Sequence, residues 1–207
     1  MKPSKHRQRS HDAPGRRRSF VRNVVVAAMM MLALGMAFGT VSADSYDDRR
    51  VRSAARLMRA LLAADEGLAA RHPDGSPVRV VVLARNARRA DPLISLIAPS
   101  AEKEAIRISG LELEVVPLLE LPAEDASPAD AVFLAEPLGD SDFDTLLTWC
   151  IARRVILYSP FEGDVERGAT AGLSIQAKVQ PFVNRRTLDA TGITLRSFFI
   201  DHSRVWP

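Results

Sequence analysis

The stretch RGATAGLSIQAKVQPFVN, residues 167–184, decides the fold that we expect for this chain. Apolar and polar residues alternate over residues 171–177 and again over residues 180–184, which is typical of the two strands of a β-hairpin. Gly172 lies in the first strand and allows close packing of the backbone, and Asn184 is a residue type that begins helices. The sequence therefore predicts a hairpin that adds antiparallel strands to a sheet and then leads into a helix.

Upstream of this hairpin, short apolar stretches alternate with segments that have the period of a helix. Strands separated by helices of this length are joined by right-handed crossovers in a mainly parallel sheet that is covered on both faces. We therefore predict an α/β fold, a three-layer sandwich whose mainly parallel sheet ends in a C-terminal antiparallel hairpin. The predicted strands are residues 78–84, 111–118, 131–136 and 155–160, and the predicted helices are residues 51–71, 91–107 and 139–154.

Several element ends can also be predicted from residue types. Pro92 is expected at the first position of its helix, where its missing N–H costs nothing. Asn184 and Gly192 are expected to begin and end a short helix. Residues 193–206 carry leucine and phenylalanine in an amphipathic run, so we predict a terminal helix there. The strand at residues 111–118 alternates most clearly and is expected near an edge of the sheet.

The first 43 residues differ in composition from the rest of the chain. They hold 8 of the 28 Lys and Arg residues and one of the 25 acids, and residues 24–43 carry no charge. A basic start, an apolar middle and small residues up to Ala43 are typical of a secretory signal peptide. We expect export to the periplasm and cleavage after Ala43, which leaves residues 44–207 as a single domain. The alternative is an uncleaved anchor, because about twenty apolar residues can span a bilayer.

Within the leader, the stretch RRRSFVR at residues 16–22 resembles the twin-arginine export signal. Arg17 and Arg18 form the pair that the export receptor reads, and Phe20 follows at the usual place. Arg16 stands where Ser or Thr is usual, so the general secretory route remains an alternative. By the twin-arginine route the protein would cross the membrane already folded.

Composition and motifs argue against several function classes. Without the leader the chain has 20 bases and 24 acids, net −4, so it lacks the basic surplus of a nucleic-acid binder. Cys150 is the only cysteine, which excludes an intramolecular disulfide, and we expect a buried thiol. After the leader only His72 and His202 remain, and neither a Gly-x-Ser-x-Gly elbow nor a glycine-rich phosphate loop occurs. We therefore expect no enzyme, no metal site and no cofactor.

Gly168, Gly172, Asn184 and Gly192, in this order around the hairpin and the short helix, resemble the signature of the YfiR/HmsC family of periplasmic proteins. The resemblance implies a non-enzymatic regulatory protein that binds and represses an inner-membrane diguanylate cyclase and so adjusts cyclic di-GMP and biofilm formation. A sensor kinase is the other membrane partner that we consider. Independently of the resemblance, a homodimer is a further candidate assembly. Each of the four residues also has a structural interpretation, as turn glycines and a helix cap.

The chain departs from the family pattern at two positions and ends in an apolar segment. The single Cys150 excludes the disulfide control of some family members, and Pro181 must lie at a sheet edge because it cannot donate a ladder hydrogen bond. Phe198, Phe199 and Trp206 near the C-terminus suit either core packing or a partner interface.

A small-ligand site is the alternative function that the predicted sheet allows. The carboxyl ends of parallel strands meet at one edge, and ligands bind there in α/β sheets. Ordinary loop capping is the other interpretation of the polar residues at that edge, and the ligand interpretation would make the protein a periplasmic solute-binding protein. The candidate residues are Arg85, Asn86, Glu136, Ser159 and Arg167.

Overall fold

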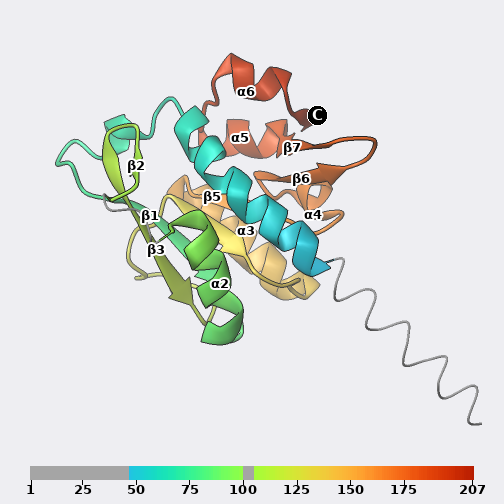
Figure 1. The fold of residues 1–207 in the computed structure, drawn as a ribbon, viewed down its shortest axis with the longest axis horizontal. Helices are drawn as coiled ribbons and strands as arrows, with labels where there is room; N and C mark the ends of the chain where they lie inside the picture. The colour runs from blue at the N-terminus through green and yellow to red at the C-terminus, as the bar shows by residue number, and fades with distance from the viewer. Residues whose placement is uncertain (1–46, 100–104) are drawn as a thin grey trace, which may run out of the picture. The chain divides into compact units, whose positions relative to one another are not determined.

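The described residues form one sheet in the strand order β2-β3-β1-β4-β5-β6-β7-β8 (Figure 1). Strands β3, β1, β4, β5 and β6 run parallel, and β7 pairs antiparallel with β6. The α/β fold with a C-terminal antiparallel hairpin is thereby confirmed. The strands are β1 (Val78–Leu83), β2 (Arg107–Ile108), β3 (Leu111–Leu118), β4 (Ala131–Leu134), β5 (Ile156–Ser159), β6 (Ala171–Ile175), β7 (Val179–Asn184) and β8 (Arg204–Trp206).

This computed structural model describes residues 47–99 and 105–207, and residues 47–207 cluster as one compact unit. The predicted export signal, with Arg17, Arg18, Phe20 and Ala43, lies outside the described residues. None of the helices that are described has the length and apolar character needed to cross a membrane.

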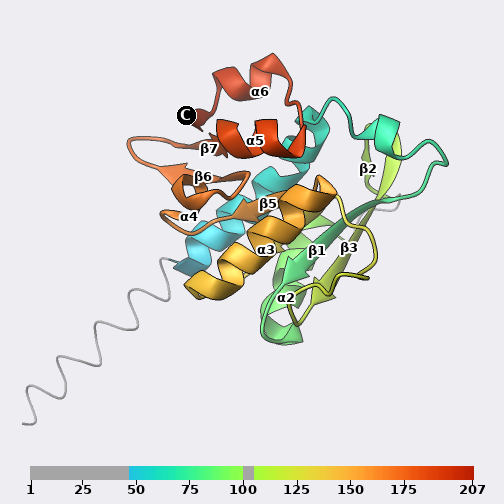
Figure 2. The same ribbon diagram turned by 180° about the vertical axis from the view of Figure 1, so that it is seen from behind.

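Helices cover both faces of the sheet. Residues 47–64 are helical and are called the first helix here; with α2 they lie in front of the sheet in Figure 1. Helix α3 covers the opposite face, as Figure 2 shows. The remaining helices are α2 (Ala87–Ile97), α3 (Asp140–Arg153), α4 (Asp164–Arg167), α5 (Arg185–Thr191) and α6 (Ser197–Asp201), and Ala69–Arg71 form a 3-10 turn, η1.

The core lies on both sides of the central strands. Every residue of β4 and β5 is buried, as expected for strands covered by helices on both faces. The rings of Phe133 and Tyr158 stack with centroids 5.5 Å apart across this pair of strands. Continuous apolar stretches therefore predict the central strands correctly.

The order of strands β3, β1 and β4 creates a crevice at the carboxyl ends of β1 and β4. Strand β1 lies between β3 and β4, so the chain leaves β1 toward one side of the sheet and then continues on the other side. Where connections reverse direction in this way, the loops at the carboxyl ends of β1 and β4 separate and leave a crevice. We call this place the switch point.

Several predicted helix boundaries are wrong. The helix predicted at residues 91–107 ends at Ile97, because Pro99 disfavours the helical conformation at Ala98, and Arg107 already belongs to β2. Helix α2 begins at Ala87 rather than Asp91, because the side chain of Asn86 accepts a hydrogen bond from the Arg89 N–H at 3.2 Å and caps the helix. Pro92 therefore lies inside α2 rather than at its first position. The first helix ends at residue 64 instead of 71, where the Asp65 carboxylate accepts the Gly67 N–H at 2.9 Å and stabilises a turn.

The chain end also differs from the prediction. Residues 193–206 do not form one helix: α6 spans five residues, and Arg204–Trp206 form β8 beside β7. The free edge of β7 offers unpaired backbone groups, which β8 satisfies. Strand β8 pairs only with residues 182–184, so Pro181 lies where β7 is still the sheet edge, as its missing N–H requires.

Candidate functional site

Two of the predicted ligand-edge residues meet at the switch point. Arg85 follows β1 and Glu136 follows β4, and the Arg85 backbone N–H donates a hydrogen bond to the Glu136 carboxylate. The Arg85 Nε lies 3.3 Å from Glu136 Oε2, with the arginine side chain 79% exposed and the glutamate side chain 16% exposed. A partly buried carboxylate thus holds an exposed guanidinium at the carboxyl edge of the sheet.

A hollow of about 240 Å³ opens beside this pair, and we call it the Arg85–Glu136 hollow. Its walls are about equally polar and apolar, and two further carboxylates lie on its lining. The residues that give it this character are Leu83, Leu119, Leu121, Leu138, Glu120 and Asp142.

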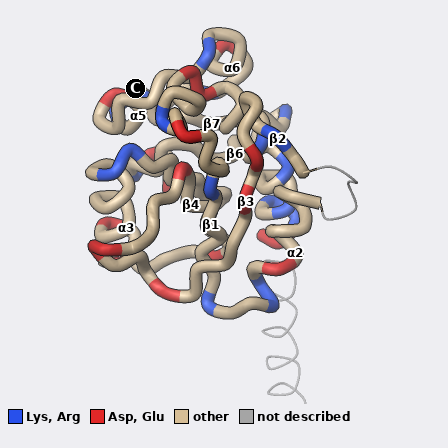
Figure 3. The backbone as a smooth tube through the Cα atoms, turned by 90° about the vertical axis from the view of Figure 1, so that its left-hand side faces the viewer, with Lys and Arg blue, Asp and Glu red and all other residues tan. Residues whose placement is uncertain are grey.

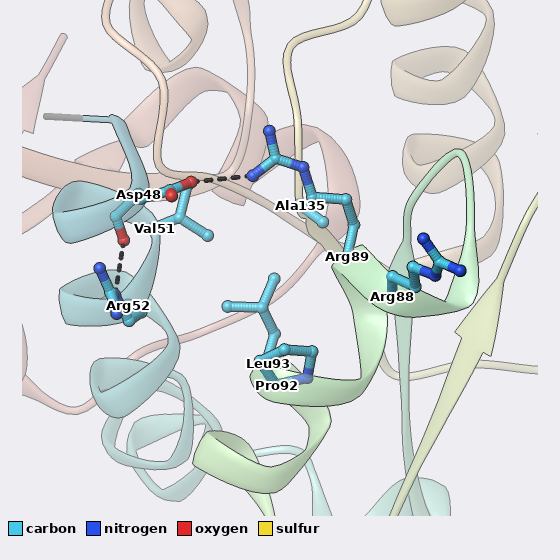
Figure 4. A pocket seen from close by; sticks show the side chains of 8 residues that line it. All are labelled: Asp48, Val51, Arg52, Arg88, Arg89, Pro92, Leu93 and Ala135. Atoms are coloured by element: carbon cyan, nitrogen blue, oxygen red, sulfur yellow. Dashed lines mark hydrogen bonds and ion pairs between the residues drawn. The ribbon is translucent and has the colours of Figure 1, made fainter. Parts of the chain in front are cut away.

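A second hollow of about 260 Å³ lies between the first helix and α2, and we call it the arginine cleft (Figure 4). The Arg89 side chain reaches from α2 toward the first helix, where its Nη1 lies 2.8 Å from Asp48 Oδ1. Arg52 donates from Nε to the main-chain oxygen of Asp48 at 3.1 Å. The lining is completed by Arg88 and by the apolar residues Val51, Pro92, Leu93 and Ala135.

The structure does not bring all five predicted edge residues together. Asn86 lies beside Arg85 but caps α2. Ser159 is buried, and its hydroxyl donates to Asp164 Oδ2 at 2.5 Å. Arg167 lies against α3, where its guanidinium pairs with Asp140 at 3.1 Å. The ligand edge is therefore smaller than predicted, because β5 ends in a closed polar turn rather than in an open loop.

The carboxyl group of Asp164, which accepts the Ser159 hydroxyl in this turn, has a shifted pKa. Burial raises the pKa of its carboxyl group above the ordinary value, and the hydrogen bond from Ser159 and the charge of Arg167 act in the opposite direction. The Arg167 guanidinium also lies over the Phe143 ring, 4.3 Å from its centroid. The contacts of Arg167 with Asp140 and Phe143 connect α4 to α3.

The four signature residues have structural roles in this fold, and Gly172 packs closely against the backbone of Ser159 in β5. Gly168 ends α4 with a φ of +130°, and Gly192 ends α5 with a φ of +65°, both of which favour glycine. Asn184 is buried, and its Oδ1 accepts the Thr187 N–H at 3.1 Å, which confirms the predicted cap. Its Nδ2 also donates to the Val165 carbonyl at 2.7 Å, so the residue connects α5 to α4.

The predicted partner face divides into buried and exposed residues. Phe198 is 57% exposed, whereas Phe199 is 6% exposed and belongs to the core. Trp206 is half-buried in β8. The five-residue helix α6 turns only one of its two phenylalanines to the surface, so the three aromatics do not form one exposed face.

Sequence reasoning missed Arg50, a buried arginine in the first helix. Its Nε donates to the Pro160 carbonyl and its Nη2 to the Leu173 carbonyl, the latter at 2.8 Å. It thereby connects the first helix to the end of β5 and to the middle of β6. The helical spacing does indicate that Arg50 is buried, because it lies four residues before the buried Ala54 and therefore on the same face of the helix.

The arginine cleft was missed as well. Its signals are the run RNARR at residues 85–89 directly after a strand and the arginine-rich polar face of the first helix. The tertiary packing of α2 against the first helix is what places these arginines around one hollow.

The two histidines among the described residues form ordinary structural contacts. His72 Nε2 lies 2.9 Å from Asp130 Oδ1 and its Nδ1 lies 2.9 Å from the Ser76 hydroxyl. His202 Nδ1 lies 2.7 Å from the Phe198 carbonyl. Within residues 47–99 and 105–207, no group of three or more His, Cys, Asp or Glu side chains is placed to hold a metal ion.

No family model matches this chain, and no curated protein matches it. Among solved structures it is similar to the ABC domain in complex with L-Trp from Streptococcus pneumoniae, with 13% identity and a TM-score of 0.46 over 75% of this chain and 60% of that chain. It is also similar to a conserved domain protein from Vibrio cholerae, with 15% identity and a TM-score of 0.39 over 61% of this chain and 54% of that one. The chain thus spans 60% or less of the length of these two proteins.

Proposed function

We propose that this protein is an exported, non-enzymatic binding protein that takes a small ligand at the switch point between β1 and β4. One observation carries the proposal: two hollows of about 240 and 260 Å³ flank the carboxyl end of β4. Ala135 lines the arginine cleft, and the next residue, Glu136, lines the Arg85–Glu136 hollow. Ligands of open α/β sheets bind at the place where the strand order reverses.

The side chains around these hollows suit binding rather than catalysis. Among the described residues that line them there is no serine, threonine, cysteine or histidine, so neither hollow offers a hydroxyl or thiol nucleophile or an imidazole base. Arg85 is largely exposed and held by one carboxylate, so its guanidinium can pair with an anionic group of a ligand. The leucines of the same hollow can cover an apolar part.

A thermal-shift screen of the full-length chain tests this proposal, because a ligand that binds only the folded state raises the melting temperature. We expect at least one class of small charged compound to raise the melting temperature. We also expect this shift to be lost in one of three variants: Arg85→Gln, Glu136→Gln, or a substitution of an arginine that lines the arginine cleft. Arg186→Gln is the matched control, since Arg186 is exposed on α5 and lies in neither hollow. A broad screen without any shift would contradict the proposal.

The regulatory function is a second candidate, favoured by the exposed Phe198 on α6 and by the resemblance of the C-terminal signature to the YfiR/HmsC family. In this case the domain docks onto the periplasmic part of a membrane diguanylate cyclase or sensor kinase and represses it. We expect Phe198→Asp to reduce co-purification of the partner from membranes and to raise cyclic di-GMP. Val179→Asp is the matched control, because Val179 is 59% exposed and lies in the hairpin instead. Unchanged cyclic di-GMP on deletion of the gene would argue against this candidate.

A further inference from the structure

The arginine cleft concentrates positive charge in a domain that is acidic as a whole. Residues 44–207 carry 20 bases and 24 acids, and both signs occur on its helices and loops (Figure 3). The lining of the cleft nevertheless contains three arginines and a single acid, Asp48. Composition alone therefore does not account for this local excess.

The existing contacts leave most of the guanidinium donors of the cleft available. Arg89 pairs with Asp48 through one nitrogen, and both side chains are about half exposed, at 52% and 49%. Arg52 uses its Nε for the main-chain oxygen of Asp48. Among the residues that the structure describes, Arg88 has neither an ion pair nor a side-chain hydrogen bond. Because each guanidinium carries five N–H donors, the cleft has far more donors than acceptors.

The other part of the lining is apolar. Leu93 and Pro92 lie on α2 below the Arg89 side chain, and Val51 faces them from the first helix (Figure 4). The volume of about 260 Å³ is small for a ligand pocket, which usually holds about 300–1,000 Å³. A ligand that satisfies both parts must therefore be compact, with an anionic group at one end and carbon at the other.

We propose that the arginine cleft binds a small phosphate monoester. Its phosphate replaces Asp48 as the partner of Arg89 and also pairs with Arg52, while its carbon part lies over Pro92 and Leu93. A phosphate monoester carries up to two charges and three terminal oxygens, which suits guanidinium groups from two different helices, whereas a carboxylate is satisfied by one arginine. This inference rests on the proposed function, since it names the class of ligand and one of the two hollows.

Calorimetric titration of the full-length chain in mild detergent tests the inference, with phenyl phosphate as the probe. We expect phenyl phosphate to bind, inorganic phosphate to bind more weakly because it lacks the apolar part, and benzyl alcohol not to bind. Absence of phenyl phosphate binding overturns the inference. Inorganic phosphate that binds as tightly as phenyl phosphate overturns the assignment of the apolar wall.

Three variants locate the site. Arg89→Gln should weaken phenyl phosphate binding about tenfold or more, through the loss of a charge-assisted pair. Asp48→Asn should strengthen binding several-fold, because it removes the competing carboxylate and keeps every arginine. Because this variant is expected to gain affinity, a misfolded protein cannot produce its result, whereas Arg89→Gln alone could lose binding by misfolding. Arg56→Gln is the matched control, since Arg56 is exposed on the same helix outside the cleft and its loss changes the charge equally. Equal weakening in Arg56→Gln and Arg89→Gln, or weaker binding in Asp48→Asn, overturns the inference.

The two proposals can fail separately. A ligand from the thermal-shift screen that depends on Arg85 and Glu136 but not on Arg89 would overturn the phosphate inference and leave the proposed function standing. A screen without any ligand would overturn both.

Discussion

Gly172 pairs with Ser159 across strands β6 and β5, and it lies so close that a methyl group at its Cα would overlap the Ser159 carbonyl oxygen and a methyl group of Val165. The Ser159 oxygen belongs to the backbone of a central strand and cannot move away without breaking the ladder. This contact explains why the hairpin joins the sheet at a glycine.

Gly172→Ala should therefore lower the free energy of unfolding by about 3 kcal/mol, at the upper end of the usual cost of overpacking. Urea denaturation measures the loss. Gly139→Ala is the matched control: its added methyl meets open space and its backbone is not left-handed, so only the poorer N-cap of α3 should cost stability, by about 1 kcal/mol or less. Equal effects of the two substitutions would contradict the packing argument.

Asn184 combines a helix cap with a tertiary hydrogen bond, and substitution can separate the two. Asn184→Ala removes both and leaves the Val165 carbonyl without its donor, so we expect a loss of about 2–4 kcal/mol in the free energy of unfolding. Asn184→Ser keeps an oxygen that can cap the helix but loses the amide donor, and the intermediate loss expected for it measures the tertiary bond. Asn86→Ala serves for comparison, because the exposed Asn86 only caps α2 and should cost about 1 kcal/mol. Similar losses at both positions would show that the tertiary bond contributes little.

The local pattern predicts those parts of the fold that are determined locally. Strands β4 and β5 are short apolar stretches between turn residues, and burial on both faces is what such stretches require. Asn184 and Gly192 bound α5 because their side chain and backbone preferences act within one turn of the helix.

The missed features depend on pairings between distant parts of the chain. Residues 204–206 form a strand because β7 has a free edge there, and no periodicity within those residues indicates it. The two hollows exist because β1 lies between β3 and β4, and strand order is not encoded in any single segment. Ser159 was assigned to the open edge because the four-residue helix α4, which closes over it, lies below the length at which helical period is visible.

The buried Asp164 should make stability depend on pH. Burial raises the pKa of its carboxyl group in the folded state above the unfolded value of about 3.9. Between these two pKa values the folded state holds a proton that the unfolded state has lost, so the free energy of unfolding falls as pH rises through this window and is level above it. Asp164→Asn lacks this term, and urea denaturation of both proteins from pH 3.5 upward measures the difference. If the free energy of unfolding of the wild type instead rises relative to that of Asp164→Asn as the pH rises through this window, the pKa of Asp164 is lowered rather than raised in the folded state.

Cys150 should be unreactive in the folded protein. The residue is fully buried in α3, and burial raises the pKa of its thiol far above the usual value, so neither access nor a thiolate is available at pH 8. We expect no reaction with a disulfide reagent such as dithionitrobenzoate until the chain is unfolded, and then one thiol per chain. Rapid reaction of the folded protein would indicate that α3 opens readily.

Arg50 offers the sharpest test of how the first helix is held on the sheet. The residue is 7% exposed, and its guanidinium donates to the carbonyls of Pro160 and Leu173. Arg50→Met fills similar volume but leaves both carbonyls without these donors, and hydrogen bonds from a charged group are worth about 1.5–3 kcal/mol each. Methionine avoids the free-energy cost of burying a charged group, and this offsets part of the loss of the hydrogen bonds. We therefore expect the free energy of unfolding to fall by about 2 kcal/mol. Arg56→Met on the exposed face of the same helix should change it by less than about 0.5 kcal/mol. If Arg50→Met is as stable as the wild type, desolvation of the guanidinium cancels its hydrogen bonds, and apolar packing alone holds the helix in place.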